Sequence, residues 1–328
     1  MTRLLLALGT LVAALSLASL VVGPAGIGPL ASLKALILGG EGPLTLVMRE
    51  IRLPRTILGI LVGAGLGASG AALQGYLRNP LAEPGLIGVS GSAALGAVLA
   101  LQTGIASAFA LALPLVALAF AGAGVGLVVG LAGPRGGSLT LILAGIAVSS
   151  LAAALGALVL NLSPNPFAAN EIVFWMMGSL ADRSLLHVWL AAPFMIAGAI
   201  PLWRMRRGLD ALTLGEDAAQ AMGIRLSRLR LALVAGVAAI VGAATAVAGS
   251  VGFVGLVVPH VLRPLVGARP SRLLPTSALG GAALVLAADI AVRVIVPERD
   301  LKLGVVTALI GAPVFLRLVL RARAEGRT

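Results

Sequence analysis

Residues 109–131 read Phe-Ala-Leu-Ala-Leu-Pro-Leu-Val-Ala-Leu-Ala-Phe-Ala-Gly-Ala-Gly-Val-Gly-Leu-Val-Val-Gly-Leu, without one charged side chain. A helix needs about 20 apolar residues to cross the hydrocarbon core of a bilayer, so this run predicts a membrane-spanning helix. Comparable runs recur along the chain, at 4–22, 56–77, 86–102, 109–131, 139–160, 187–203, 230–249, 251–267, 273–292 and 303–320. The sequence therefore predicts an all-α integral membrane protein, with about ten transmembrane helices in a compact bundle that forms one domain over residues 1–328.

The composition excludes several other classes of protein. Hydrophobic residues make up 59% of the chain and charged residues 11%, whereas a soluble domain carries about 25% charged residues. A soluble protein of 328 residues could not bury so much apolar surface. The net charge of +12 comes from basic residues that are thinly spaced between apolar runs, so no nucleic-acid partner is expected and lipid surrounds the chain. The absence of cysteine excludes disulfides and thiolate metal sites.

The distribution of basic residues predicts the orientation. The run at 4–22 is interpreted as a first span, because it exceeds the apolar region of a typical signal peptide. With a cytoplasmic N-terminus, sixteen basic residues fall inside, namely Arg3, Arg78, Arg135, Arg204, Arg206, Arg207, Arg225, Arg228, Arg230, Arg263, Arg269, Arg272, Arg317, Arg321, Arg323 and Arg327. Eight fall outside, namely Lys34, Arg49, Arg52, Arg55, Arg183, Arg293, Arg299 and Lys302. The positive-inside rule then places both termini in the cytoplasm.

Small residues recur at helical spacing within the predicted spans. Gly59, Gly63 and Gly67 form one row, and Gly122, Gly126 and Gly130 form another. Such rows let helix backbones approach closely, which predicts a tightly packed bundle. Residues 65–70 match the G-x-G-x-x-G pattern of dinucleotide sites, but they lie within an apolar run and are interpreted as helix packing. The apolar stretch near residue 250 is interrupted by Gly249, Gly252 and Pro259, which predicts a short or broken helix pair there.

The residues that carry common enzyme and transport chemistry are few. No phosphate-binding G-x-x-x-x-G-K-[ST] loop occurs, so the chain is not expected to hydrolyse ATP. His187 and His260 lie far apart in sequence and are interpreted as packing residues rather than metal ligands.

Asp289 and Arg293 are predicted to form an ion pair on one helix face. The alternative class is an ion-coupled secondary transporter, which needs carboxylates or broken helices at the bilayer midplane. An Asp289 that is neutralised by Arg293 disfavours this class. A stand-alone channel is the third possibility.

The longest charged segment, 204–230, is predicted to be cytoplasmic. Within it, 214–223 predicts a short helix with Glu216 and Asp217 at its positive N-terminal end and Gly223 at its C-terminal end. Two interpretations stay open at this point: a solvated connector, or a docking helix for a cytoplasmic partner. The second rests on an apolar stripe, formed by Leu214, Ala218, Ala219 and Met222.

Several longer motifs carry a family resemblance. They are Arg52-Leu-Pro-Arg55, Gly70-Ala-Ala-Leu-Gln74, residues 78–90, Trp175-Met-Met-Gly-Ser179, residues 214–223, Gly252-Phe-Val-Gly-Leu-Val-Val-Pro-His260 with Arg263, Ala288-Asp289 and residues 304–313. In this order they resemble the permease family of ABC (ATP-binding cassette) importers for iron-siderophore, haem and cobalamin uptake, the FecCD/BtuC-like type II importers. Two positions depart from the family pattern: Lys302 replaces a proline, and Ser92 stands where glycine is common.

The resemblance implies the fold, partners and sites. It implies a type II ABC importer permease in the bacterial inner membrane, working as a homodimer with two cytoplasmic ATPase subunits and a periplasmic solute-binding protein. This permease would carry a metal chelate (ferric siderophore, haem or cobalamin) into the cytoplasm. No cofactor is expected in this chain, since ATP and Mg belong to the partner ATPase. Arg52, Arg55 and Arg293 match residues that dock the binding protein. The coupling residues would be Leu214, Gly215, Glu216, Asp217, Ala218, Ala219, Met222 and Gly223, and Ser138 lies near the inner gate.

Overall fold

The computed structural model describes residues 1–23, 26–40, 42–133, 136–163, 166–295 and 301–324. Arg135, Arg299 and Arg327, which enter the count of basic residues above, lie outside these ranges. Throughout the described part the regular structure is helical. The helices are α1 (Thr2–Val21), α2 (Pro29–Leu38), α3 (Pro43–Leu46), α4 (Leu53–Leu77), α5 (Val89–Gln102), α6 (Ala112–Ala132), α7 (Ser138–Asn161), α8 (Pro166–Met176), α9 (Leu185–Leu212), α10 (Glu216–Ala221), α11 (Leu226–Ala248), α12 (Val254–Leu262), α13 (Pro270–Ile295) and α14 (Leu303–Ala324).

The prediction of an all-helical membrane protein is confirmed. In the described ranges, seven segments are long and apolar enough to cross a bilayer: α1, the continuous stretch Pro43–Leu77, α6, α7, α9, α11 and α13. The remaining predicted runs fall on the apolar helices α5, α12 and α14, of which the apolar stretch of α14 covers Leu303–Leu318. The broken helix predicted near residue 250 is present, since α11 ends at Ala248 and α12 begins at Val254. The short helices α2, α3 and α8 were not predicted, because none is long enough to give a spanning run.

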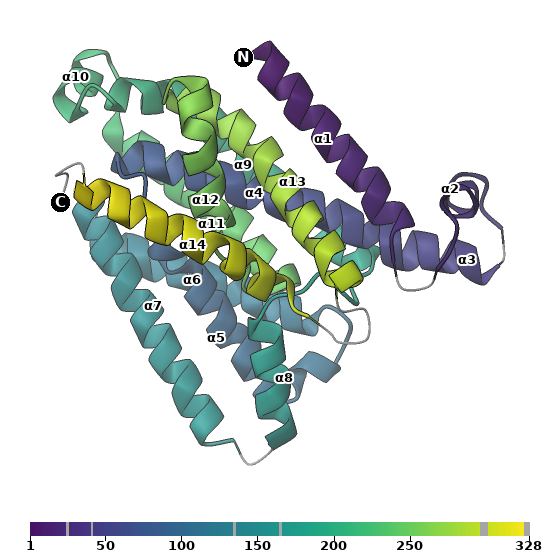
Figure 1. Ribbon diagram of the computed structural model, residues 1–328. Coiled ribbons are helices and arrows are strands. Elements are labelled where there is room, and N and C mark those ends of the chain that lie inside the picture. The colour runs from purple at the N-terminus through teal and green to yellow at the C-terminus, as the bar shows by residue number, and fades with distance from the viewer. Residues whose placement is uncertain (24–25, 41, 134–135, 164–165, 296–300, 325–328) are drawn as a thin grey trace.

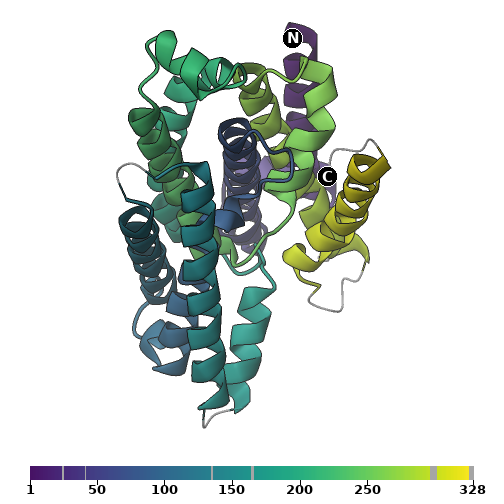
Figure 2. The same ribbon diagram turned by 90° about the vertical axis from the view of Figure 1, so that its left-hand side faces the viewer.

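Helix α4 lies in the middle of the bundle and packs against α9, α11, α12 and α13 (Figures 1 and 2). The predicted glycine row makes this possible. A methyl group on Gly63 would lie 2.3 Å from the carbonyl oxygen of Gly281, and one on Gly67 would lie 2.0 Å from that of Ser277. Residues 65–70, which match the dinucleotide pattern, belong to the same helix, and Gly70 touches the backbone of Gly255. Helix packing is therefore confirmed as their role.

The second glycine row behaves differently. Gly122, Gly126 and Gly130 on α6 are exposed, and a methyl group built on any of them meets no other atom within 4 Å. The prediction that this row packs helices closely is wrong within the single chain. The small-residue spacing of the two rows is the same, but α6 turns Ala117, Ala121 and Gly124 inward instead. Periodicity alone does not determine which face of a wholly apolar helix is buried.

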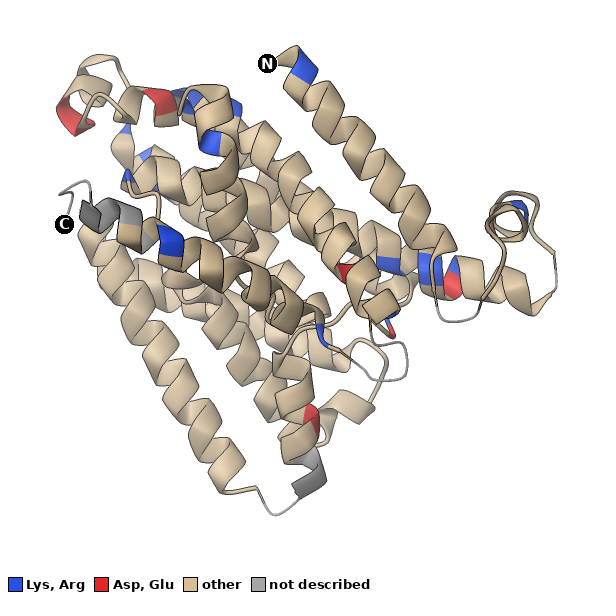
Figure 3. Cartoon of the chain, viewed as in Figure 1, with Lys and Arg blue, Asp and Glu red and all other residues tan. Residues whose placement is uncertain are grey.

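The two ends of the bundle differ in charge. The N-terminus and α10 lie at the same end (Figure 1), and the basic residues of the α9–α11 region gather around α10 (Figure 3). At the opposite end, α2 and α3 project beside the last turns of α1 and α13, where a second group of charged residues lies (Figures 1 and 3). The fold therefore separates the two sets of predicted site residues to opposite ends.

Candidate functional site

The segment between α9 and α11 forms the predicted short helix. Helix α10 spans Glu216–Ala221, with Glu216 and Asp217 in its first turn. Gly215 and Gly223, at φ +106° and +83°, adopt backbone conformations that glycine reaches without steric cost. The amide of Gly223 donates to the carbonyl of Gln220, which ends the helix. The predicted start and stop of this helix are therefore confirmed.

The apolar residues of this segment do not form one stripe. Ala219 is fully buried against the bundle, whereas Leu214 is 69% exposed and Met222 is 62% exposed. Ala218 is half-buried. The reason is the length of α10: at six residues it has room for one inward contact before the chain turns back into α11. Two large apolar side chains thus stand free at the charged end of the bundle, where they can be covered by a partner.

Arg230 links this region to the turn between α6 and α7. Its guanidinium group donates to the carbonyl oxygens of Gly136 and, at 3.1 Å, of Gly133. The turn then leads into Ser138, the first residue of α7. A pocket of about 270 Å³ between the two elements is lined by Gly136, Gly137, Glu216 and Arg230, among others. The loop beside Ser138 and the start of α10 therefore line one pocket, a proximity that was not predicted from the sequence.

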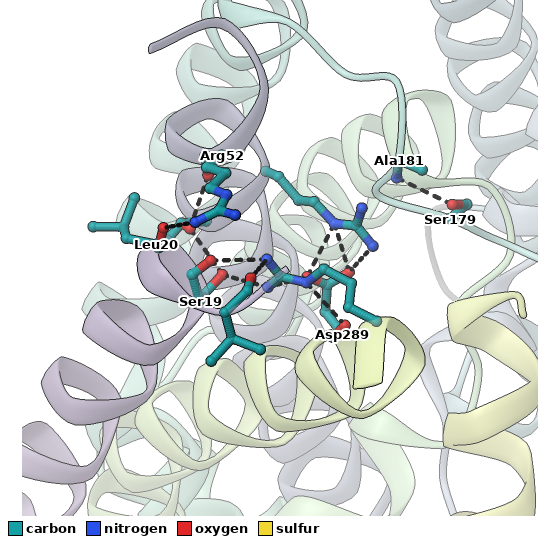
Figure 4. Close-up of polar contacts among 10 residues, drawn as sticks. Ser19, Leu20, Arg52, Ser179, Ala181 and Asp289 are labelled. Atoms are coloured by element: carbon teal, nitrogen blue, oxygen red, sulfur yellow. Dashed lines mark hydrogen bonds and ion pairs between the residues drawn. The ribbon is translucent and has the colours of Figure 1, made fainter. Parts of the chain in front are cut away.

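At the opposite end, two of the three predicted docking arginines bind the end of α1. Arg293 donates to the carbonyl oxygens of Ser19 (2.8 Å) and Val22 (3.0 Å) and to the hydroxyl of Ser19 (2.7 Å). Arg52 donates to the carbonyl oxygens of Leu20 (2.8 Å) and Val21 (3.0 Å). The last carbonyls of a helix lack partners within it and carry partial negative charge, so guanidinium groups satisfy them well. These contacts fasten α1 to α13 and to Arg52, the residue that precedes α4 (Figure 4).

One carboxylate balances part of this positive charge. Asp289 pairs with Arg293 at 2.9 Å, as predicted for residues four apart on a helix, and also with Arg55 at 2.8 Å. Asp289 is 1% exposed, Arg52 5% and Arg293 8%. Within this chain, then, Arg52 and Arg293 donate hydrogen bonds to the end of α1. Arg55 is the most accessible of the three arginines. The predicted docking role of these residues stays a prediction, to which the structure adds a packing role.

A second polar cluster joins two of the motifs. The side chain of Gln74 on α4 accepts from Arg263 at 2.8 Å and donates to the carbonyl of Leu256 at 3.2 Å. The carboxylate of Glu83 accepts from the amide of Phe253 at 2.8 Å, which caps the start of α12. These bonds hold the segment 78–90 against α12 near the centre of the bundle.

Three glycine positions bring further motifs together. A methyl group on Gly178 would lie 2.4 Å from the carbonyl oxygen of Ser250, and one on Gly249 would lie 2.3 Å from that of Trp175. Gly304, at the start of α14, approaches the carbonyl of Met177 just as closely. Beside this contact lies an open apolar hollow of about 810 Å³, lined by residues such as Met176, Phe253 and Leu309. The quoted motifs therefore share contacts although they are far apart in sequence.

The two departures from the family pattern are both accommodated. The ammonium group of Lys302 lies 5.2 Å from the centre of the Phe174 ring, a cation–π distance. Ser92 is buried and occupies the space that Gly124 leaves open on α6. His187 accepts a hydrogen bond from the amide of Ser184 and so caps the start of α9, which supports its interpretation as a packing residue.

Comparison with known proteins agrees with this architecture. A solved structure of an ABC transporter assigned to the metal-chelate type, in an inward-facing conformation, matches 98% of this chain and 100% of its own with a TM-score of 0.86 and 32% identity. The PsaBC structure from Streptococcus pneumoniae, at 17% identity and a TM-score of 0.53, shares the fold alone.

The curated relatives are permease proteins. The ferric enterobactin transport system permease protein FepD of Escherichia coli (strain K12) is 40% identical over 85% of this chain and 84% of its own. The hemin transport system permease protein HmuU of Yersinia pestis is 37% identical over 84% of each chain. The cobalamin import system permease protein BtuC of Halobacterium salinarum is 38% identical over 83% of this chain and 73% of its own.

The all-helical bundle and these relatives define a type II permease subunit of an ABC importer, a multi-pass inner-membrane protein. The chain belongs to the FecCD transport family, whose model matches residues 11–321. It is a transport subunit rather than an enzyme, and the ATPase activity of such systems lies in a separate subunit.

Proposed function

We propose that this chain moves a metal chelate from the periplasm to the cytoplasm, with ATP hydrolysis in a separate subunit as the energy source. The chelate class is that of the relatives: a ferric siderophore, haem or cobalamin. The observation that carries the proposal is that α10 packs on α9 and α11, and that Arg230 of α11 donates to the turn that leads into Ser138. Glu216 of α10 and this turn line one pocket. A displacement of α10 by a docked ATPase would reach this turn through α11 and Arg230.

The exposed apolar residues of the α10 segment form the proposed ATPase-docking surface. Leu214 and Met222 are the large apolar side chains there, and burying them against a partner stabilises the complex in proportion to the area removed from water. Gly215 and Gly223 allow the tight turns that present them. Glu216 and Asp217 lie on the same helix and provide charged contacts at the rim.

The family membership and an open apolar hollow support the partners that we propose. We propose a homodimer, because the apolar hollow beside Phe253 and Leu309 opens on one face and a second copy would close it into a central path. The small and aliphatic lining would let a bulky chelate pass without gripping it. Both termini are proposed to be cytoplasmic, in line with the sixteen-to-eight distribution of basic residues.

Docking of a periplasmic binding protein is proposed at the end that carries Arg52, Arg55 and Arg293. Charge-assisted pairs at a protein surface fix how two partners are positioned against each other, and they accelerate association. Arg55 and Arg293 share one aspartate, and Arg52 binds backbone carbonyls beside them, so these four side chains carry an excess of positive charge that suits acidic residues on a partner. Arg55, with 15% of its side chain exposed, is the accessible member.

The alternative class is an ion-coupled secondary transporter. It would need an ionisable group free to bind and release the coupling ion. The buried carboxylate of Asp289 is held by two guanidinium groups, which favours a structural pair over an ion relay. Proteoliposomes that contain the chain with its ATPase and binding protein test the proposal: uptake of labelled chelate should require ATP and should not respond to a proton or sodium gradient.

A further inference from the structure

A long apolar groove lies on the outside of the bundle, between α4, α9 and α13. It encloses about 450 Å³. Its lining combines small residues, among them Gly65, Ala68 and Ala278, with larger ones, among them Ile196 and Ile200. Ile196 is 58% exposed and Ile200 46% exposed, so this face of α9 is open to the surroundings. In a membrane protein such a face meets lipid chains.

One end of the groove is basic. Trp203 and Arg204 close it at the end where α9 approaches the charged segment 204–230. The guanidinium group of Arg206 lies 4.0 Å from the centre of the Trp203 ring. Arg204 is exposed and makes no ion pair with any residue that the structure describes. On α13, Arg272 precedes the groove residues Leu274 and Pro275 by less than one turn and is also exposed.

We propose that this groove binds an anionic phospholipid, with an acyl chain along α9 and the phosphate at Arg204. The pattern is that of an amphiphile: the lining is apolar along its length, and the basic side chains stand at one end only. Basic pockets between transmembrane helices on the cytoplasmic side are suited to anionic headgroups, and an exposed tryptophan is typical of the headgroup level. The site is distinct from the apolar hollow beside Phe253 and from the α10 segment.

The groove contacts elements that the proposed transport cycle uses. Gly65 of the groove packs on Ile240 of α11, and α9 continues from Arg204 towards the α10 segment. A bound lipid would therefore brace α9 against α4 at the end where the ATPase docks. Lipid occupancy should stabilise the full chain even when no chelate or ATPase is present.

Lipid binding can be measured on the full chain after delipidation in detergent. We would titrate phosphatidylglycerol, phosphatidylcholine and glycerol 3-phosphate, following the melting temperature and counting bound lipids by native mass spectrometry. Phosphatidylglycerol should raise the melting temperature more than phosphatidylcholine does, and glycerol 3-phosphate, a headgroup without chains, should have no effect. Arg204→Gln should weaken phosphatidylglycerol binding about fivefold.

Matched substitutions distinguish the groove from the general lipid surface. Ala199 in the groove and Ala123 on α6 are both exposed alanines of apolar helices. Ala199→Phe fills the groove and should abolish the preference for phosphatidylglycerol, whereas Ala123→Phe should keep it. Arg3→Gln, at the same end of the bundle, should also keep it. Equal binding by Ala199→Phe and Ala123→Phe would overturn the proposal, as would stabilisation by glycerol 3-phosphate alone, which would mean a phosphate site without a lipid.

Discussion

Arg55 on α4 and Asp289 on α13 form an ion pair at 2.8 Å, although 234 positions separate them in the chain. The same carboxylate also holds Arg293, whose remaining donors reach the end of α1. Asp289 is therefore the point through which α1, α4 and α13 are joined at this end of the bundle. Its burial makes the cluster sensitive to loss of the single negative charge.

Replacing Asp289 should destabilise the chain much more than replacing Arg55. Asp289→Asn leaves two guanidinium groups without their counter-charge, and breaking a buried pair in this way costs about 3–5 kcal/mol. Arg55→Gln leaves the pair between Asp289 and Arg293 intact and should cost about 1 kcal/mol, because Arg55 is partly exposed. Melting temperatures of the two purified variants check this order, and a smaller effect for Asp289→Asn would contradict the described role of the carboxylate.

The two glycine rows should respond oppositely to alanine. In Gly67→Ala the new methyl group would lie 2.0 Å from the carbonyl oxygen of Ser277, so α4 and α13 must separate, at a cost of about 1–3 kcal/mol or more. Gly126→Ala meets no atom within 4 Å and should be neutral or gain up to about 1 kcal/mol of helix stability. Expression level and thermal unfolding in detergent compare the two, and equal losses would argue against the packing described here.

Arg230→Gln should separate ATP hydrolysis from transport. The substitution removes a charged donor from the turn that leads into Ser138, where hydrogen bonds of this kind are worth about 1.5–3 kcal/mol. The assembled complex should still hydrolyse ATP, but less chelate should enter per ATP. Arg228→Gln is the matched control, because Arg228 is exposed two positions earlier on α11. If both variants couple normally, the link between the turn and α10 has no role in transport.

Charge reversal at the opposite end tests the docking of a binding protein. Arg55→Glu should reduce uptake, because repulsion replaces attraction at the rim, and it also places two carboxylates together at Asp289. Melting temperatures must therefore accompany the uptake assay. Acid-to-Lys changes on the binding protein should restore uptake if Arg55 docks it. Failure of every such exchange with a well-assembled complex would leave Arg55 as a packing residue.

The sequence predicted the spans well because bilayer thickness imposes one length on every crossing helix. It predicted the Asp289–Arg293 pair and the bounds of α10 because both depend on residues that are close together in the sequence. The contact of Arg55 with Asp289 could not be found in this way, since it depends on how α4 crosses α13. The contact of Arg230 with Gly133 could not be predicted either, because the sequence shows only that this residue is basic.

The sequence also could not predict which face of each helix is buried. The rows at Gly63 and Gly126 have the same spacing, yet the first is packed and the second is exposed. Each helix is apolar on all sides, so hydrophobic periodicity carries no information about its orientation. For the same reason the groove at Ala199 and Arg204 was not predicted, although its basic end is visible as a charge that follows an apolar run.

Helix α10 is proposed to couple ATP hydrolysis in a separate subunit to uptake through this chain. The direct measurement is labelled chelate taken up per ATP hydrolysed in proteoliposomes that hold the complete complex. Met222→Glu places a charge on the exposed apolar surface of the segment, and Gln220→Glu places the same charge on the same helix outside that surface. We predict that Met222→Glu abolishes ATP-dependent uptake while Gln220→Glu retains it. Normal uptake per ATP in Met222→Glu, or uptake that proceeds without ATP, would contradict coupling through α10.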